Sequence, residues 1–329
     1  MKDLSTSFLG LKLRSPLIVG SCGLTKTAES IQTLAGNGAG AVVLKSLFEE
    51  QITAELSHNL DQYQADYPEA FDYIREYTRT SAVEEYLDLI AAVTKAVDIP
   101  IIASINCLSA KEWMSFAQSA QKAGAAAIEL NVSILPSDPN LTSAACEKQY
   151  FDIVHQVSDM VNIPVALKMS QYAPALANLI TRLSWTGKVA GFVLFNRYFR
   201  PDIDLKQVRV TKADVFSTPG EMIEPLRWIA LLSPLIEQDL AASTGVHDGN
   251  GMIKQLLAGA AAVQVVSTVY KNGAGQLARM LGELESWMDE KGYACLADFK
   301  GALSHRQAGN PAAFERIQFM KQFGGVGQE

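Results

Sequence analysis

Eight short apolar runs, rich in Val, Ile, Leu and Ala, recur along the chain and are separated by stretches with helical patterning. Runs of this kind are typical of parallel strands that helices cover on both faces. Eight of them in one chain predict an α/β fold, the (β/α)8 or TIM barrel. The runs cover residues 16–20, 41–44, 100–105, 125–130, 164–167, 190–195, 240–242 and 261–266.

A polar residue follows most of these runs. In a (β/α)8 barrel the carboxyl ends of the strands meet at one mouth, where the active sites of such enzymes lie. We therefore expect these polar residues to gather at the mouth and to carry the chemistry. They are Ser21, Lys45, Asn106, Asn131, Lys168, Asn196, Ser243 and Ser267.

The composition fits a single enzyme domain over residues 1–329, located in the cytoplasm. A net charge of −7 without a Lys/Arg-rich run argues against nucleic acid as a partner. No apolar stretch is long enough to span a bilayer, so we expect no membrane partner. The four cysteines lack the spacing of metal ligands or of a disulfide framework, and we expect no metal.

Segments between and beyond the runs predict a plug, three long connections and closing helices. Residues 4–13 have the pattern of a small hairpin that closes the bottom of the barrel. The connections 47–80, 133–146 and 197–222 each follow a strand, so we expect them at the mouth as a lid or a binding wall. The last part of the chain predicts extra helices over about 275–322.

The last two strand ends carry hydroxyl groups and a glycine that suit a phosphate. Ser243, Thr244 and Gly245 end the seventh run, and Ser267 and Thr268 end the eighth. In barrels, the loops after these two strands often bind phosphate through hydroxyls and through the N–H groups of a helix N-terminus. Helix capping by the same side chains is the alternative interpretation.

Two lysines and three asparagines at other strand ends indicate an anionic, planar ligand. Lys45 and Lys168 follow apolar residues, and a buried ammonium group needs a partner such as an anionic ring or a carboxylate. The amides of Asn106, Asn131 and Asn196 match the imide-like edges of a heterocycle. Alternatively, one lysine could form a Schiff base with a sugar phosphate, which would make the protein a lyase or isomerase.

Short motifs accompany most of the predicted strands. They are Gly20-Ser-Cys-Gly23 after the first, Val43-Leu-Lys-Ser46 at the second, Glu129-Leu-Asn-Val-Ser133 at the fourth, Leu167-Lys168 at the fifth and Ala261-Ala-Val-Gln-Val at the eighth. A closing stretch adds Lys291-Gly-Tyr and Ala297-Asp-Phe-Lys-Gly301. In order and spacing these motifs resemble those of the class 1 dihydroorotate dehydrogenases, over nearly the whole chain.

This resemblance implies an FMN-dependent oxidoreductase that acts on a CH–CH bond, as in the oxidation of dihydroorotate to orotate in pyrimidine biosynthesis. It also implies that Lys168 stabilises the reduced, anionic flavin. The implied cofactor-binding residues are Ser21, Cys22, Gly23, Lys45, Ser46, Asn106, Asn131, Lys168, Gly220, Thr244, Gly245, Ser267 and Thr268. The implied catalytic residues are Lys45, Asn131 and Ser133, and the implied substrate-binding residues are Lys45, Asn59, Asn131, Asn196 and Arg197.

The chain departs from the family pattern where the substrate reacts. Ile134 stands at the position of the cysteine that removes a proton in the family. An aliphatic side chain cannot take a proton, so Ser133 or Ser137 is the candidate replacement. His58-Asn59-Leu60-Asp61 lies in the region of the family's substrate loop, and Asn196-Arg197 replaces an Asn-Ser pair. A small anionic compound related to dihydroorotate is therefore an alternative substrate.

The electrons need a destination outside the chain. Because no cysteine cluster could hold an iron–sulfur group, they would pass to a soluble acceptor or to a partner redox protein. The protein could therefore be a flavoprotein subunit that works with an electron-transfer partner. The resemblance to the class 1 enzymes also implies a homodimer.

Overall fold

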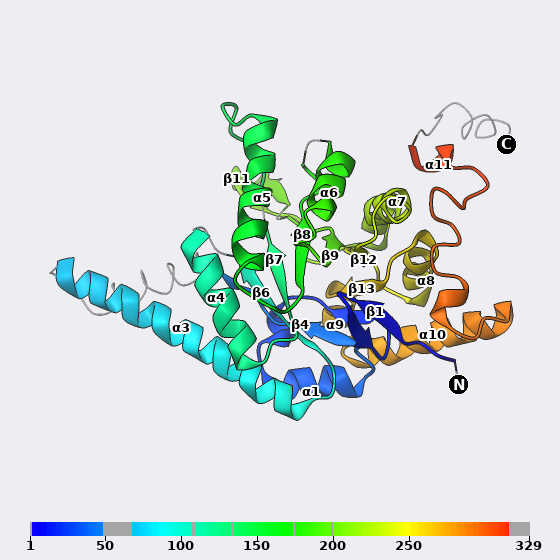
Figure 1. Cartoon of the computed structure of the whole chain (residues 1–329), viewed down its shortest axis with the longest axis horizontal. Coiled ribbons are helices and arrows are strands. Elements are labelled where there is room, and N and C mark those ends of the chain that lie inside the picture. Colours follow the sequence, from blue (N-terminus) through cyan, green and yellow to red (C-terminus); the bar gives the residue numbers. More distant parts are fainter. Residues whose placement is uncertain are drawn as a thin grey trace.

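A closed parallel sheet forms the centre of the molecule (Figure 1). The computed structural model describes residues 2–48, 68–106, 110–132, 134–173, 175–198 and 200–315. The barrel strands are β3 (Leu17–Val19), β4 (Ala41–Val43), β6 (Ile101–Asn106), β7 (Ala127–Asn131), β8 (Val165–Met169), β9 (Gly191–Leu194), β12 (Asp239–Ser243) and β13 (Ala262–Val265). They follow one another in the order β4-β3-β13-β12-β9-β8-β7-β6, and the pairing of β4 with β6 closes the ring. The predicted (β/α)8 barrel is confirmed.

Each barrel strand lies within one of the eight predicted apolar runs or extends it by one or two residues. A short strand, β5 (Leu47–Phe48), pairs with the end of β6, beyond the residues of β6 that pair with β4. The polar residues that were expected at the strand ends are therefore at or near those ends. Asn106, Asn131 and Ser243 are the last residues of their strands, and Lys168 is the residue before the last in β8.

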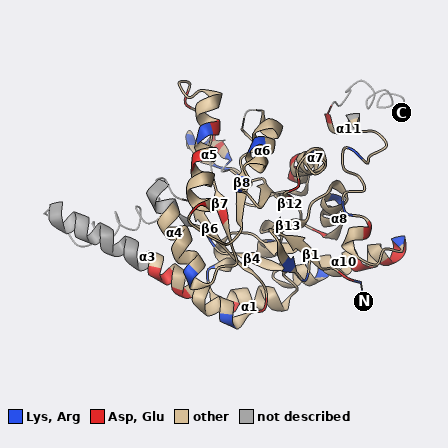
Figure 2. Cartoon of the chain, in the orientation of Figure 1, with Lys and Arg blue, Asp and Glu red and all other residues tan. Residues whose placement is uncertain are grey.

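Helices connect the strands and cover the outside of the barrel (Figure 1). They are α1 (Ala28–Gly36), α3 (Pro68–Ala96), α4 (Ala110–Ala123), α5 (Ser143–Ser158), α6 (Leu176–Trp185), α7 (Ile223–Leu232), α8 (Gly249–Ala258), α9 (Ser267–Asn272), α10 (Gly275–Lys291) and α11 (Ala312–Glu315). Thr27, Thr142 and Asp248 each accept a hydrogen bond from a first-turn N–H of α1, α5 and α8. These caps satisfy N–H groups that a helix cannot pair internally. Charged residues lie mainly on the helices, whereas the barrel strands carry few (Figure 2).

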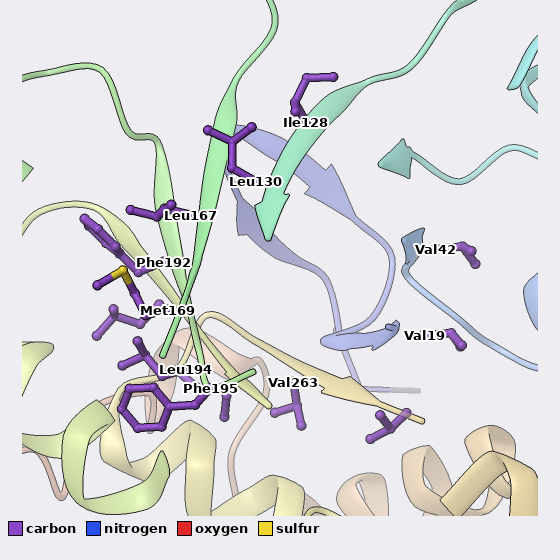
Figure 3. Packing of buried hydrophobic residues seen from close by; sticks show 14 of the residues in the cluster. Val19, Val42, Ile128, Leu130, Leu167, Met169, Phe192, Leu194, Phe195 and Val263 are labelled. Atoms are coloured by element: carbon purple, nitrogen blue, oxygen red, sulfur yellow. The ribbon is translucent and has the colours of Figure 1, made fainter. Parts of the chain in front are cut away.

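The main apolar core lies between the outer face of the sheet and the helices (Figure 3). Successive side chains of a strand point to opposite faces of the sheet. In β7, Ile128 and Leu130 therefore join this outer core, whereas Ala127 and Glu129 point into the barrel. Burial of one such aliphatic side chain contributes about 1.5–3 kcal/mol, so the helices hold the ring closed from outside.

The predicted hairpin closes the bottom of the barrel. It consists of β1 (Thr6–Phe8) and β2 (Leu11–Leu13), which pair antiparallel. Phe8, Leu9 and Leu13 are at most 3% exposed and pack with the small inward side chains of the barrel strands. The N–H of Leu9 donates to Oδ2 of Asp239 in β12 at 2.8 Å, which ties the turn to the sheet. The prediction of a plug is confirmed.

The segment 47–80 differs from its prediction as a long connection. Residues 47–48 form β5, and Pro68 begins α3, which continues to Ala96. Residues 49–67 lie outside the described part of the chain. After Pro68, which the first turn of a helix tolerates, no Gly or Pro interrupts the sequence up to Ala96, so its aromatic residues extend a helix.

Two other predicted segments contain ordered elements. The connection 197–222 folds into an antiparallel hairpin, β10 (Pro201–Asp204) with β11 (Arg209–Lys212), followed by the 3-10 helix η2 (Pro219–Met222). The closing region starts with α10, continues through turns and a short 3-10 helix at Leu296–Asp298, and reaches α11. Residues 316–322 of the predicted closing helices lie outside the described residues.

None of the helices in the described part of the chain combines the length and the apolar character needed to cross a membrane.

The plug generates a stability prediction. Leu13 is fully buried, whereas Leu235 is 55% exposed in the turn between α7 and β12. We expect Leu13→Ala to lower the free energy of unfolding by about 2–5 kcal/mol, because it leaves a cavity under the barrel. The matched control Leu235→Ala should change it by less than about 0.5 kcal/mol. Urea unfolding followed by circular dichroism measures both, and equal effects would contradict the role of the plug.

Candidate active site

A cavity of about 210 Å³ opens at the carboxyl ends of the strands, on the side opposite the plug. Its walls come from the turn after β3, the ends of β8, β9, β12 and β13, and the connection before η2. Seven residues that the sequence predicted as binding residues line it: Ser21, Lys168, Asn196, Arg197, Thr244, Gly245 and Ser267. The barrel therefore brings together side chains that are up to about 250 positions apart in the sequence.

One end of the cavity is built for an anion. The backbone from Ser243 to Val246, together with Ser217 and Ser267, forms this end. Ser267 begins α9, and its Oγ accepts a hydrogen bond from the N–H of Ser217 at 3.0 Å. Hydroxyls and unpaired N–H groups at the start of a helix are typical phosphate ligands. We call this part of the cavity, residues 217, 243–246 and 267, the hydroxyl end.

The Thr244-Gly245 turn requires its glycine. Thr244 and Gly245 both have left-handed backbone angles, with φ of 81° and 80°. A Cβ atom on Gly245 would lie 2.2 Å from the backbone nitrogen of Met222 in η2. Oγ1 of Thr244 donates to the carbonyl of Phe195 at 3.2 Å, which fixes the turn against the end of β9. Strained backbone of this kind persists where the surroundings hold it, often at binding sites.

Thr268 and Gly220 lie outside the cavity lining. The hydroxyl of Thr268 is fully buried and donates to the carbonyl of His247 at 2.8 Å, so it stabilises the loop after β12. Gly220 lies in η2, where a Cβ atom would meet only Oγ1 of Thr218 at 3.9 Å. His247 contacts the hydroxyl end through Ser217, with 3.0 Å between Nε2 and Oγ. Burial and the nearby charge of Lys271 lower the pKa of His247.

The other end of the cavity carries a buried ring of three polar side chains, Glu129, Lys168 and Gln264. Lys168 Nζ lies 3.4 Å from Oε1 of Glu129 and 3.1 Å from Oε1 of Gln264. Nε2 of Gln264 donates to the second oxygen of Glu129 at 2.5 Å. The three residues are 1%, 8% and 2% exposed, respectively. This polar ring gives Lys168 the partner that a buried ammonium group needs.

Serine hydroxyls link the cavity wall to the interior. Oγ of Ser21 lies 3.0 Å from Oγ of Ser46, which lies 2.6 Å from Oγ of Ser104. The N–H of Ser46 also donates to Ser21 at 2.8 Å. Tyr86 completes the cluster through the backbone of Ser104, and burial raises its pKa. Ser46 therefore positions Ser21 and does not itself line the cavity.

The neighbouring turn packs closely on α9. Cys22 is half-buried against the outer core, and this burial raises the pKa of its thiol. A Cβ atom on Gly23 would lie 2.6 Å from the hydroxyl oxygen of Tyr270. A larger residue at position 23 would therefore require the Tyr270 side chain to move.

Arg197 holds one wall of the cavity in place. Its Nε donates to Oε2 of Glu221 at 2.9 Å, and its remaining nitrogens donate to the carbonyls of Val215, Asp214 and Phe216. Arg200 pairs with the same carboxylate oxygen at 2.8 Å. Burial opposes the ionisation of Glu221, but the hydrogen bonds and charges of these arginines hold its pKa below the usual value. The structure therefore shows Arg197 in a network that fixes the connection before η2.

Four other residues singled out from the sequence do not line the cavity. Asn131 is 8% exposed, and its Oδ1 accepts no hydrogen bond from the described residues. Lys45 and Asn106 are half-buried at the ends of β4 and β6. Ile134 is half-buried and packs against the outer core, so it presents no atom that could accept a proton. Ser133 and Asn59 lie outside the described residues.

Sequence reasoning missed Glu129, Gln264 and Ser217 as site residues. A signal for the first two was present, because Glu129 is the only charged residue of run 125–130 and Gln264 is the only polar residue of run 261–266. A polar residue inside a buried run needs a partner. Ser217 lies in a connection without periodic pattern, so only the folded chain shows that it faces the cavity.

Comparison with known proteins agrees with this geometry. The family model described as dihydroorotate dehydrogenase matches residues 3–288. The chain belongs to the dihydroorotate dehydrogenase family. The enzymes of this family are oxidoreductases that act on a CH–CH bond.

Curated relatives align with almost the whole chain. The catalytic subunit of dihydroorotate dehydrogenase B (NAD(+)) from Thermoplasma volcanium is 26% identical over 93% of this chain and 100% of its own length. The corresponding subunit from Methanothermobacter thermautotrophicus is 25% identical over 92% of this chain and 98% of its length. Dihydroorotate dehydrogenase A (fumarate) from Lactococcus lactis subsp. lactis is 26% identical over 91% of this chain and 99% of its length.

Two of the three predicted cofactor-binding glycines, Gly245 and Gly220, allow a matched test of the hydroxyl end. We expect Gly245→Ala to lower the free energy of unfolding by at least about 1–3 kcal/mol, because of its positive φ and the contact with Met222. Gly220→Ala should be nearly neutral, since a Cβ atom fits there. Thermal unfolding of the two variants without added ligand is the measurement. A neutral Gly245→Ala would show that the turn is not held as described.

Proposed function

We propose that the protein is an FMN-dependent oxidoreductase that oxidises a CH–CH bond of dihydroorotate or of a closely related small anion, in pyrimidine biosynthesis. The cavity carries this proposal, because it joins a hydroxyl end to a buried lysine in a chain of the dihydroorotate dehydrogenase family. A sugar-phosphate lyase or isomerase has weaker support, since Lys168 is engaged by Glu129 and Gln264 and the family is one of oxidoreductases.

The residues present fit FMN. The hydroxyl end would hold the phosphate, with Ser267 at the start of α9 and the backbone of Thr244 and Gly245 close to it. Ser21 and Lys168 would hold the ring system at the other end. Oδ1 of Asn131, at the end of β7, has no donor among the described residues, and because a buried acceptor without a donor is costly, this supports a ligand at the strand ends beside the cavity. Bound FMN would supply the hydride acceptor for the oxidation.

The side chains of this chain would orient the substrate and balance charge. Lys168 places a positive charge where a reduced ring would carry a negative one. We propose that Lys45, Asn131 and Asn196 bind the substrate from the strand ends around the cavity, with Asn59 and Ser133 as further candidates. Arg197 would act by holding the wall formed by residues 214–216.

The electrons would leave through an external acceptor or a partner redox protein. The relatives differ in the acceptor that their names give, which is NAD(+) for one group and fumarate for the other. The name "catalytic subunit" of the first group describes a protein that works with another subunit. The cysteines of this chain have no cluster-binding spacing, and we propose that it depends on such an acceptor in the cytoplasm.

We further propose a homodimer that uses the β10–β11 hairpin. Ile203 and Val210 are directly opposite one another on one face of the hairpin and are 62% and 72% exposed. Leu205 and Val208 at its tip are 86% and 85% exposed. An isolated two-stranded hairpin is marginally stable, and an apolar face of this kind typically packs against a partner. A second copy of the chain would cover it.

The effect of Ile134 on the reaction can be tested by placing a base at its position. We expect dihydroorotate to reduce the FMN-loaded protein slowly, and Ile134→Cys to accelerate this by roughly 10²–10⁴-fold by supplying a base. Anaerobic mixing with dihydroorotate, followed by the loss of flavin absorbance, measures the rate. Ile134→Val is the control without a base and should match the natural protein. Equal rates in all three proteins would show that position 134 does not face the reacting carbon.

The proposed dimer contact can be tested by placing a charge on the apolar face of the β10–β11 hairpin. We expect Ile203→Asp to convert a dimer into a monomer, because a charge would be buried in the apolar contact. Thr211→Lys adds a charge to the other face of the hairpin, opposite Asp202, and should leave the dimer intact. Sedimentation equilibrium measures the mass of both variants. A natural protein that sediments as a monomer would contradict the proposal.

A further inference from the structure

The polar ring of Glu129, Lys168 and Gln264 contains one member that cannot touch a ligand in the cavity. Lys168 and Gln264 line the cavity, whereas Glu129 does not and is 1% exposed. Both carboxylate oxygens of Glu129 are occupied, one by Lys168 and the other by Gln264. Any effect of Glu129 on a ligand therefore passes through these two neighbours.

The surroundings of Glu129 leave it little else to interact with. Glu129 alternates along β7 with Ile128 and Leu130, which face the outer core, so its carboxylate points into the barrel. Deeper inside, the barrel is filled by small apolar side chains such as Ala127 and Ala166 and is closed by the plug. A carboxylate in such a place persists only when it is paired, and Lys168 is the cation that pairs with it.

The Glu129–Lys168 pair changes the net charge that a ligand meets at the cavity wall. With Glu129 ionised, the charge of Lys168 is already balanced when a neutral ring occupies the cavity. When the ring carries a negative charge, Lys168 is shared between two anions. Without the carboxylate, the full charge of Lys168 would act on the ligand and would favour its anionic form.

We propose that Glu129 is a positioning residue that holds Lys168 at the cavity wall and limits how strongly the site favours reduced, anionic FMN over oxidised FMN. This inference rests on the proposed binding of FMN. Gln264 takes part by accepting a hydrogen bond from Lys168 and donating one to Glu129, which keeps the Lys168 ammonium directed between β7 and β13.

The test is the midpoint potential of FMN bound to Glu129→Gln, which keeps the shape of the side chain and removes its charge. We expect the ratio of affinities for reduced and oxidised FMN to rise by at least about tenfold, because a charge within about 12 Å contributes that much at an effective dielectric constant near 20. A tenfold change corresponds to an increase of about 30 mV for a two-electron couple. Spectroscopic titration against a reference dye measures this potential.

Two further variants complete the experiment. Glu147→Gln removes a carboxylate that pairs with Arg182 on the outside of the barrel, and it should leave the potential unchanged. Glu129→Asp keeps the charge but shortens the reach to Lys168, so its potential should lie between those of the natural protein and Glu129→Gln. It also provides a measurement if Glu129→Gln does not fold.

The outcomes separate this inference from the proposed function. A natural protein that does not bind FMN would overturn both. If FMN binds to the natural protein and to Glu129→Gln with the same potential, only the role of Glu129 is wrong. If Glu129→Gln loses thermal stability without any change in potential, Glu129 is a structural residue, and the inference is likewise overturned.

Discussion

Closure of a parallel sheet into a ring is the constraint on which the other features depend. Once β4 pairs with β6, every strand has two neighbours, and successive side chains face either the helices or the barrel interior. The outward set is apolar and packs against the helices. The inward set changes along the barrel axis, from the apolar layer above the plug to the polar side chains of the mouth. The cavity exists because closure brings these carboxyl ends together.

The barrel interior contains a buried ion pair, Glu129 and Lys168. Glu129 and Lys168 are both almost fully buried, and desolvation of two charges is recovered only with close pairing and full hydrogen bonding. Gln264 adds one hydrogen bond to each member of the pair from the opposite side of the ring. The chain thus keeps the buried lysine expected of a flavoenzyme. At the position that the family resemblance assigns to the proton acceptor, the chain has Ile134, whose side chain cannot accept a proton.

Much of the fold could be predicted from the sequence because buried parallel strands have a strong local signal. Each of the eight apolar runs became a strand, and residues 4–13 became the plug. The segment 68–80 was expected to be part of a loop and is part of α3, since aromatic residues can continue a helix when neither Gly nor Pro interrupts it. For the site, strand ends indicated Ser21, Lys168 and Ser267, which line the cavity.

The sequence by itself determined the periodic pattern, the strand ends and the replacement at Ile134, since these are properties of neighbouring residues. Only the tertiary structure decided which side chains meet. Gln264 reaches Glu129 across the barrel from 135 positions away, and Arg197 turns its donors to the loop 214–216. Thr268 bonds to His247 and does not line the cavity. Such contacts depend on barrel closure and on the path of each connection, which no local pattern of residues encodes.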